Sequence, residues 1–352
     1  MSYEKDFAAA LASIRLEKPI SDEDLEYALP LERAWGMTDS KHDEYEHHQL
    51  RLRRFLEEPR LVDRPSIVAI LERKREELAK GGFDFAARDD IFEAVKVDFV
   101  HTTARYEGNP MTLSEVSLVI EQDEVIPKAS FRSHLEVHDI AQAFDAMVES
   151  AKSGEEISMP LILKLHSIAA ANLPECDAGE LRWDQVYITN SKILPPPAKA
   201  VGPLLAALID WYLEKPCLER ACGFHLVFED IHPFQDGNGR IGRILLNHQL
   251  LGLGYPVTPL KCDGNSTRRY YDAIRCFTES EPDRRVDGFL NVVADAIDDA
   301  MYRPLQRICA DGRRSGRPSP IDSSRLDAGL PVPRRNQNGP TSCGSSIRRS
   351  TR

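Results

Sequence analysis

The sequence has no long apolar run and no excess of basic residues, and each absence excludes a class of protein. No stretch approaches the roughly 20 apolar residues that a transmembrane helix needs. The first residues lack a basic cap before an apolar run, so we expect neither a membrane span nor a standard export signal. The net charge of −11 at pH 7 argues against a general nucleic-acid binder, which needs surplus lysine and arginine.

Paired cysteine motifs are also missing. The number of cysteines, seven, is odd, and no two of them form a CxxC pair, which argues against a disulfide framework or a zinc site. We therefore expect reduced thiols and a cytoplasmic protein. The cysteines are Cys176, Cys217, Cys222, Cys262, Cys276, Cys309 and Cys343.

What the sequence contains is helical periodicity. With 42% hydrophobic and 29% charged residues, the 352-residue chain is typical of a soluble globular protein. Apolar residues recur at three- and four-residue spacing over most of the chain, so the predicted fold is mainly α. The predicted helices span residues 43–56, 65–78, 87–106, 134–152, 158–172, 200–214, 218–231, 239–253, 266–280 and 285–301.

Two segments depart from this pattern. Between Asp184 and Ile193 the apolar period falls to two around an Asn-Ser turn, which predicts a small β-hairpin. The end of the chain is rich in Ser, Pro, Gly and Arg, which predicts a disordered tail. We therefore divide the chain into an N-terminal helical region (1–98), a central helical domain (99–303) and a low-complexity tail (304–352).

The segment from His232 to Arg243, HPFQDGNGRIGR, carries the most chemical information. Pro233 cannot continue a helix, so the helix before it should end with His232 at its mouth. Gly237 and Gly239 allow a close approach of the backbone, and the next helix points its unpaired amides at this loop. A histidine thus lies beside a predicted anion site, where it can act as a general base near neutral pH.

The two arginines of this segment indicate which anion binds. Arg240 and Arg243 lie in the first turns of a helix, where cations oppose the macrodipole unless an anion lies between them. Asn238 adds amide donors, and Asp236 is placed to hold a Mg²⁺ ion that bridges phosphates. The segment predicts a phosphate cradle and transfer of a phosphorus group to a hydroxyl. The alternative is a plain Gly-Asn loop with solvent-facing arginines.

The whole run resembles the Fic family signature HPFx[D/E]GNGRxxR, and residues 232–243 fill all of its specified positions. The resemblance covers roughly residues 100–300 and implies a Fic-type helical bundle that transfers AMP from ATP to a protein Tyr, Thr or Ser hydroxyl. It implies His232 as the base, Asp236 as the metal ligand and Arg243 as the γ-phosphate clamp. The nucleotide-binding set it implies is Pro233, Phe234, Gln235, Asp236, Gly237, Asn238, Gly239, Arg240 and Arg243.

The resemblance also extends to residues outside the signature. The predicted hairpin looks like the family's flap, in which Tyr187 and Ile188 would dock a target segment by strand addition. An ordinary surface hairpin is the alternative. Tyr270 and Tyr271 match a tyrosine pair near the nucleotide base, and aromatic core packing explains them equally well.

Upstream, the segment from Thr103 to Gly108 resembles the [S/T]xxxE[G/N] motif of the autoinhibited class II Fic proteins. By this resemblance Glu107 pairs with Arg243, which we expect to be bidentate, and so removes the γ-phosphate clamp. Four-residue spacing places Thr103 above Glu107 on the helix. The alternative is an exposed glutamate at a helix end with local partners such as Arg105.

One further motif is set aside. His134 and His138 lie one helical turn apart, a spacing that can bind a metal ion. No third ligand is evident, because Glu136 points to the opposite side of the helix. We assign the two histidines to a helix surface or a packed polar face.

The sequence thus predicts an ATP- and Mg²⁺-dependent protein adenylyltransferase that is restrained by Glu107 and also modifies itself. The alternatives are a Fic-fold transferase that uses UMP, phosphocholine or phosphate, and a non-catalytic peptide-binding module. A Doc-like kinase is disfavoured because that branch carries lysine where this chain has Gly239. The expected partners are ATP and a protein substrate, without membrane or nucleic acid, and the oligomeric state is left open, a homodimer included.

Overall fold

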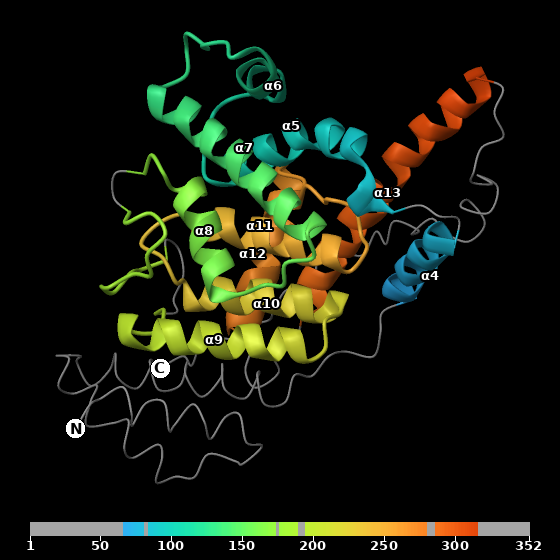
Figure 1. Ribbon diagram of the computed structural model, residues 1–352. Coiled ribbons are helices and arrows are strands. Elements are labelled where there is room, and N and C mark those ends of the chain that lie inside the picture. The colour runs from blue at the N-terminus through green and yellow to red at the C-terminus, as the bar shows by residue number, and fades with distance from the viewer. Residues whose placement is uncertain (1–65, 81–83, 174–175, 189–193, 280–285, 316–352) are drawn as a thin grey trace, which may run out of the picture. The chain divides into compact units, whose positions relative to one another are not determined.

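The computed structural model describes residues 66–80, 84–173, 176–188, 194–279 and 286–315, and these residues form a helical bundle (Figure 1). No β-strand is assigned within these ranges, so the mainly α prediction is confirmed. The elements are α4 (Ser66–Lys80), the 3-10 turn η1 (Phe85–Ala87), α5 (Asp89–Tyr106), α6 (Leu113–Gln122), α7 (Phe131–Lys152), α8 (Met159–Ala169), α9 (Ala198–Glu214), α10 (Leu218–Ile231), α11 (Asn238–Gly252), α12 (Gly264–Glu279) and α13 (Asp287–Ser315).

Helix α11 forms the centre of the bundle. It contacts α10, α7, α8 and α5, and nearly all of its residues are buried. Figure 1 shows α11 in the middle, with α5 and α7 on one side and α9 and α10 on the other. A helix that is buried on all sides must satisfy its polar groups inside the protein, because burying an unpaired polar group is costly.

Asn247 and His248, in the distal half of α11, meet this demand with neutral partners. The Asn247 side chain donates to the carbonyl of Arg243 at 2.9 Å and accepts from the amide of Thr258 at 2.6 Å. His248 lies 3.1 Å from the hydroxyl of Ser150 on α7. These bonds anchor the helix, and they leave the arginines of its first turns as the buried charges to explain.

Short capping motifs begin the helices around the centre. Thr112 and Glu115 form a capping box at the start of α6. The side chains of Ser130 and Ser158 cap α7 and α8, each by accepting a hydrogen bond from a backbone amide. Helix α6 was not predicted from its apolar spacing, although the T-x-x-E pattern that begins it is a recognisable signal.

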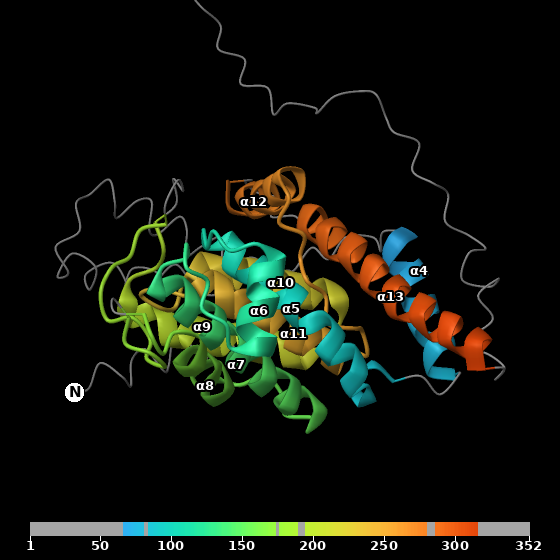
Figure 2. The ribbon, with the colours of Figure 1, turned by 90° about the horizontal axis from the view of Figure 1, so that it is seen from above.

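Helices α4 and α13 lie side by side (Figure 2), joined by an ion pair of 2.6 Å between Lys74 and Asp298. Arg75 of α4 donates to the carbonyl of Leu253 at 2.7 Å, which ties α4 to the end of α11. The chain divides into two compact units, residues 1–307 and 308–352. Helix α13 includes the first residues of the predicted tail, and the predicted boundary at residues 98 and 99 falls within α5.

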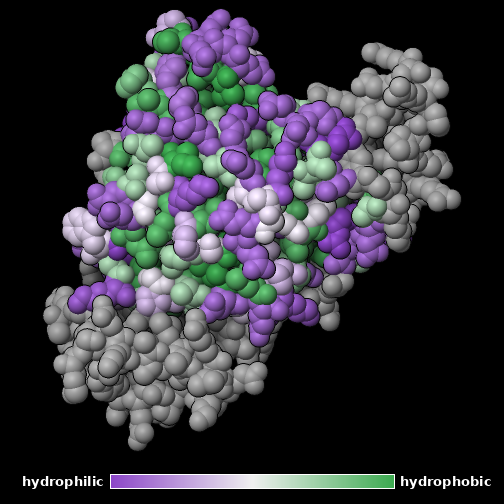
Figure 3. Space-filling view, viewed as in Figure 1, coloured by the Kyte–Doolittle hydropathy of each residue, from purple (hydrophilic) through white to green (hydrophobic). Residues whose placement is uncertain are grey.

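The exposed large apolar side chains fall into groups. Leu113 begins α6, Phe131 begins α7 and Val125 lies in the loop between them, where Figure 3 shows apolar surface among polar surface. Trp183 and Tyr187 are also exposed. Among the described helices, none combines the length and the apolar character that a membrane span needs. The cysteines in the described part of the chain are all free thiols.

Candidate active site

Helix α10 ends at His232, whose backbone adopts the left-handed conformation with φ 50° and ψ 64°. A non-glycine residue in this region is strained, and such strain is held by its surroundings. Here Arg182 donates through Nε to the carbonyl of His232 at 2.7 Å, and its own amide donates to the carbonyl of Pro233 at 2.9 Å. The buried Arg182 therefore fixes the exit of the chain from α10.

The ring of His232 is fixed by one nitrogen. Nδ1 lies 3.2 Å from the carbonyl of Glu229, which can only accept, so Nδ1 carries the proton and Nε2 keeps its lone pair. Burial lowers the pKa of His232 to about 4, opposed by the bond to Glu229 and aided by the nearby Arg182. The imidazole is therefore neutral at pH 7 and has an accepting nitrogen.

The loop after His232 closes through a single amide side chain. Asn238 accepts from the amide of Phe234 at 2.9 Å and donates to the carbonyl of Phe234 at 2.8 Å. Gly237 occupies the left-handed region with φ 82°, and its amide donates to Asp236 Oδ1 at 2.6 Å. The side-chain amide of Asn238, expected to serve a ligand, is thus engaged with the loop, and its backbone amide is left at the start of α11.

His166 of α8 supports this loop from below, and sequence reasoning missed it. The amide of Gly179 donates to Nδ1 at 2.9 Å, so the proton resides on Nε2, which donates to the carbonyl of Asp236 at 3.1 Å. The ring stacks on Phe234 with centroids 3.6 Å apart. Burial lowers the pKa of His166 to about 4 and keeps it neutral. A single histidine in an apolar helix gave no signal of this role.

The arginines of α11 are both buried and both paired with carboxylates. Arg240 Nη2 lies 2.6 Å from Oε1 of Glu136 on α7, and Arg243 Nη2 lies 2.5 Å from Oε1 of Glu107. Within the described residues, Nε and Nη1 of Arg240 and Nε of Arg243 have no hydrogen-bond partner. Buried donors without partners beside a helix N-terminus are what a polyanion site requires.

Glu107 stands at the C-terminal cap of α5. Burial raises its pKa, but Arg243 and Arg240 outweigh burial, so the pKa of Glu107 is lowered and the carboxylate is charged at neutral pH. Arg243 Nη2 also donates to the carbonyl of Thr103 at 3.2 Å. The predicted pairing of Glu107 with Arg243 is present, although through one hydrogen bond of 2.5 Å where a bidentate pair was expected.

Gly239 is required by this pair. A Cβ atom at this position would lie 2.7 Å from Glu107 Oε1 and 3.0 Å from Arg243 Nη1. Any side chain at residue 239 would therefore displace the carboxylate of Glu107, and a lysine would not fit beside it.

The predicted tyrosine pair separates into two environments. Tyr270 is fully buried, and its hydroxyl lies 2.9 Å from Nε2 of His225, so it packs in the core. Tyr271 is 49% exposed and donates to the carbonyl of Tyr106 at 3.2 Å. The ring of Tyr106 lies 4.7 Å from that of Tyr270 and beneath the guanidinium of Arg243. The aromatic cluster thus forms one wall beside Arg243.

The described half of the predicted hairpin, residues 184–188, is not a strand. Its backbone is held by side chains instead, because the Gln185 amide donates to the carbonyls of Val186 and Pro195 at 3.1 and 3.0 Å. Tyr187 is exposed and Ile188 is half-buried. The second half of the hairpin, residues 189–193, lies outside the described residues.

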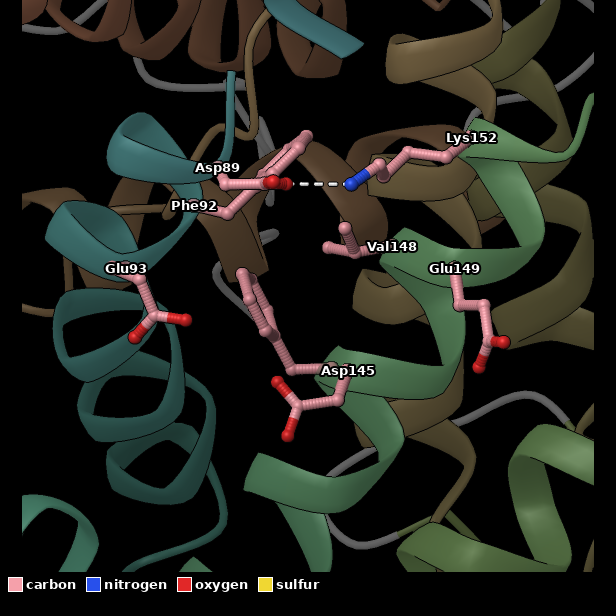
Figure 4. A pocket seen from close by; sticks show the side chains of 8 residues that line it. Asp89, Phe92, Glu93, Asp145, Val148, Glu149 and Lys152 are labelled. Carbon is pink, nitrogen blue, oxygen red and sulfur yellow. Dashed lines mark hydrogen bonds and ion pairs between the residues drawn. The ribbon is translucent and has the colours of Figure 1, made fainter. Parts of the chain in front are cut away.

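A cleft of about 270 Å³ between α5 and α7 lies away from these residues. Figure 4 shows Phe92, Val148 and acidic side chains around it, with Lys152 paired to Asp89 at 2.5 Å. It flanks the first turn of α5, and Glu107 ends the same helix roughly 25 Å further on. This cleft holds none of the motif residues and is not the candidate active site.

Comparisons with known proteins agree with this geometry. A model of the Fic/DOC family matches residues 156–250. Protein adenylyltransferase fic-1 of Caenorhabditis briggsae is 33% identical over 183 residues, which are 50% of this chain and 35% of the relative. Protein adenylyltransferase Fic of Nematostella vectensis is 31% identical over 172 residues, or 47% of this chain and 40% of the relative.

A solved structure shares the fold. The crystal structure of a Fic domain containing signaling protein from Bacteroides thetaiotaomicron superposes with a TM-score of 0.57 and 19% identity, covering 73% of this chain and all of that one. The chain spans less than half the length of the curated relatives named above. The match to the Fic/DOC family model covers residues 156–250, which include residues 232–243, and it confirms the resemblance found in the signature.

Proposed function

We propose that this chain is a protein adenylyltransferase, which transfers AMP from ATP to a Tyr, Thr or Ser hydroxyl of a protein and also to itself. One observation carries the proposal. Three buried guanidinium nitrogens of Arg240 and Arg243 have no partner in the described part of the chain, and they belong to the helix that follows a neutral histidine. The curated relatives named as protein adenylyltransferases support the same activity.

In this reaction His232 acts through Nε2. That nitrogen accepts the proton of the target hydroxyl while the hydroxyl oxygen forms a bond to the α-phosphorus of ATP. The bond from the α-phosphorus to the bridging oxygen breaks, and pyrophosphate leaves with the electron pair. Arg240 and Arg243 hold the β- and γ-phosphates, and the first amides of α11 add donors along the chain of phosphates.

Asp236 fits the role of magnesium ligand. Mg²⁺ commonly takes one or two carboxylates and completes its shell with phosphate oxygens and water. No group of three or more acidic, histidine or cysteine side chains suited to a metal occurs among the described residues, so the ion would bind together with ATP. When bound, it neutralises the charge of the phosphates.

We further propose that Glu107 keeps the enzyme in an inactive resting state. Its carboxylate occupies Nη2 of Arg243, which is a nitrogen that the γ-phosphate would otherwise use. ATP then binds with its α-phosphate turned away from in-line attack. The exposed Trp183 and Tyr187 lie on the segment after Gly179, and we assign that segment to docking of the target by strand addition.

The test is labelling with ATP that carries the label on its α-phosphate. We expect the Glu107→Gly variant to become labelled. Adding His232→Ala to it should lower the labelling rate about 10²-fold or more, because the base is removed. Asp236→Ala should require more magnesium for the same rate. The His232→Ala and Asp236→Ala variants should unfold at a temperature close to that of the Glu107→Gly protein, measured by calorimetry.

Other outcomes contradict the proposal in distinct ways. Transfer only from labelled UTP or from a phosphocholine donor assigns a different donor to the same site. Label from the γ-phosphate of ATP indicates a kinase, which is disfavoured because this chain has Gly239 where the Doc-like branch carries lysine. Binding of a protein without any transfer indicates a non-catalytic module.

A further inference from the structure

Glu136 lies on the face of α7 that is turned toward the active site. Its Oε1 is 2.6 Å from Nη2 of Arg240, and the side chains are only 12% and 5% exposed. His134, on the same helix, is occupied elsewhere, since its Nε2 accepts from the amide of Ile126 at 2.8 Å. The glutamate is therefore the residue of this motif that reaches the predicted phosphate cradle.

The two carboxylates leave their arginines in different states. Glu107 engages Arg243 through Nη2, which also donates to the carbonyl of Thr103, and Nε is the Arg243 nitrogen left without a partner. Glu136 also engages a single nitrogen, but both Nε and Nη1 of Arg240 are buried and unpartnered within the described residues. Arg240 is thus fixed at one end and open at the other.

Asn109 connects this pair to the inhibitory segment. Its Nδ2 donates to Glu136 Oε2 at 2.8 Å and to the carbonyl of Ser133 at 3.1 Å. Burial raises the pKa of Glu136, opposed by Arg240 and Asn109. Because both carboxylate oxygens have partners, the rotamer of Glu136 is set before any ligand arrives.

We propose that Glu136 is a positioning residue for the donor nucleotide, holding the guanidinium of Arg240 by Nη2 so that Nε and Nη1 remain available to phosphate oxygens. This role rests on the proposed transfer function. It is the opposite of the role of Glu107. Removing Glu107 frees an arginine that ATP needs, whereas removing Glu136 lets an arginine turn away from the place where ATP needs it.

The experiment uses the Glu107→Gly chain as parent and adds Glu136→Gln, which keeps the shape and removes the charge. We expect the KM for ATP to rise about tenfold, while kcat changes less than about threefold. The affinity for pyrophosphate, used as a competing ligand, should fall by a similar factor. Adenosine, which has no phosphates, should inhibit parent and variant equally, which a general loss of structure would not produce.

Two controls connect the effect to Arg240. In a parent that also carries Arg240→Ala, Glu136→Gln should change the KM for ATP by less than about twofold, because the residue through which it acts is gone. Glu149→Gln, an exposed change on the same helix, should leave the KM unchanged.

Several results would overturn this role. One is an unchanged KM for ATP in Glu136→Gln. Another is a rise in labelling when Glu136→Gln is made in the otherwise natural chain, which would make Glu136 a second inhibitory contact. If the Glu107→Gly parent neither binds ATP nor transfers AMP, the proposed function itself is contradicted and this role loses its basis. That outcome is distinguishable, because it is seen in the parent before residue 136 is changed.

Discussion

At the scale of single residues, His166, His225 and His232 differ in what their ring nitrogens bond. His166 uses both nitrogens, Nε2 for the carbonyl of Asp236 in the loop after His232 and Nδ1 for the amide of Gly179. His225 directs Nε2 to the hydroxyl of Tyr270 and stacks on Phe289. His232 is tied through Nδ1, and its Nε2 has no partner in the described part of the chain. Nδ1 of His225 also has no hydrogen-bond partner in the described part of the chain, but that ring is buried in the core, whereas His232 is half-buried and is therefore the one suited to proton transfer.

The pH dependence of the reaction follows from the surroundings of His232. A base works in its neutral form, so activity falls as pH drops through its pKa, which burial lowers from 6.5 to about 4. We expect kcat/KM of the Glu107→Gly variant, at saturating magnesium, to be nearly constant from about pH 8 to about pH 6 and to fall only below that range. An inflection at or above pH 6.5 would contradict this environment of the ring.

At the scale of elements, α5 is fastened to the bundle along its length. Near its start Asp89 pairs with Lys152 of α7, and Lys96 pairs with Asp145 of the same helix at 2.7 Å. Its last residue, Tyr106, donates to the carbonyl of Lys261 at 2.8 Å. The carboxylate of Glu107 is therefore delivered by a docked helix, which reduces the entropy lost in forming its pair with Arg243.

Release of this pair is the change expected to activate the enzyme. Glu107→Gly should raise self-labelling about tenfold or more, because a charge-assisted hydrogen bond to Arg243 is worth about 1.5 kcal/mol or more. Glu93→Gly is the matched control, since Glu93 is exposed on the same helix and its loss should leave the rate unchanged. A Glu107→Gly rate equal to that of the natural chain would end the claim of inhibition.

At the scale of the whole molecule, the centre of the bundle contains charge. Arg240 and Arg243 extend from α11 to carboxylates on α7 and at the end of α5, and Glu229 of α10 lies against Gly242. A charged centre costs stability, because desolvation offsets much of the attraction between buried ions. This cost is acceptable where the charges serve a binding site.

Glu229 makes this cost measurable. Burial raises its pKa from 4.5 to about 7, partly opposed by Arg243. The folded protein then holds this proton more tightly than the unfolded chain. The free energy of unfolding is therefore unaffected by this group below about pH 4.5 and falls by up to about 3 kcal/mol as the pH rises to about 7.

Replacing Glu229 by Gln should therefore reduce the loss of stability between about pH 5 and about pH 8. The measurement is the free energy of unfolding from urea titrations at each pH. Glu149→Gln, at an exposed position, should leave the pH dependence unchanged. An equal pH dependence in the natural chain and in Glu229→Gln would show that this carboxyl is not responsible.

Most of the helices could be predicted from the sequence because apolar spacing reports which face is buried. The end of α10 at His232 followed from Pro233, and the pairing of Glu107 with Arg243 followed from the family resemblance. Helix α6 was missed although it begins with a capping box and carries Leu113, Val116 and Ile120 at helical spacing. In the predicted hairpin, residues 184–188 are held by side-chain bonds and are not a strand, and residues 189–193 lie outside the described residues.

The sequence by itself determined the loop from His232 to Arg243, because proline, glycine and helix polarity act on immediate neighbours. Only the tertiary structure decided which residues from other helices enter that loop's surroundings. His166, Glu136 and Asn109 come from segments 74 to 131 residues before Arg240, and their contacts depend on how whole helices pack. Local patterns carry no record of such long-range neighbours, which is why no role was predicted for the buried glutamate on α7.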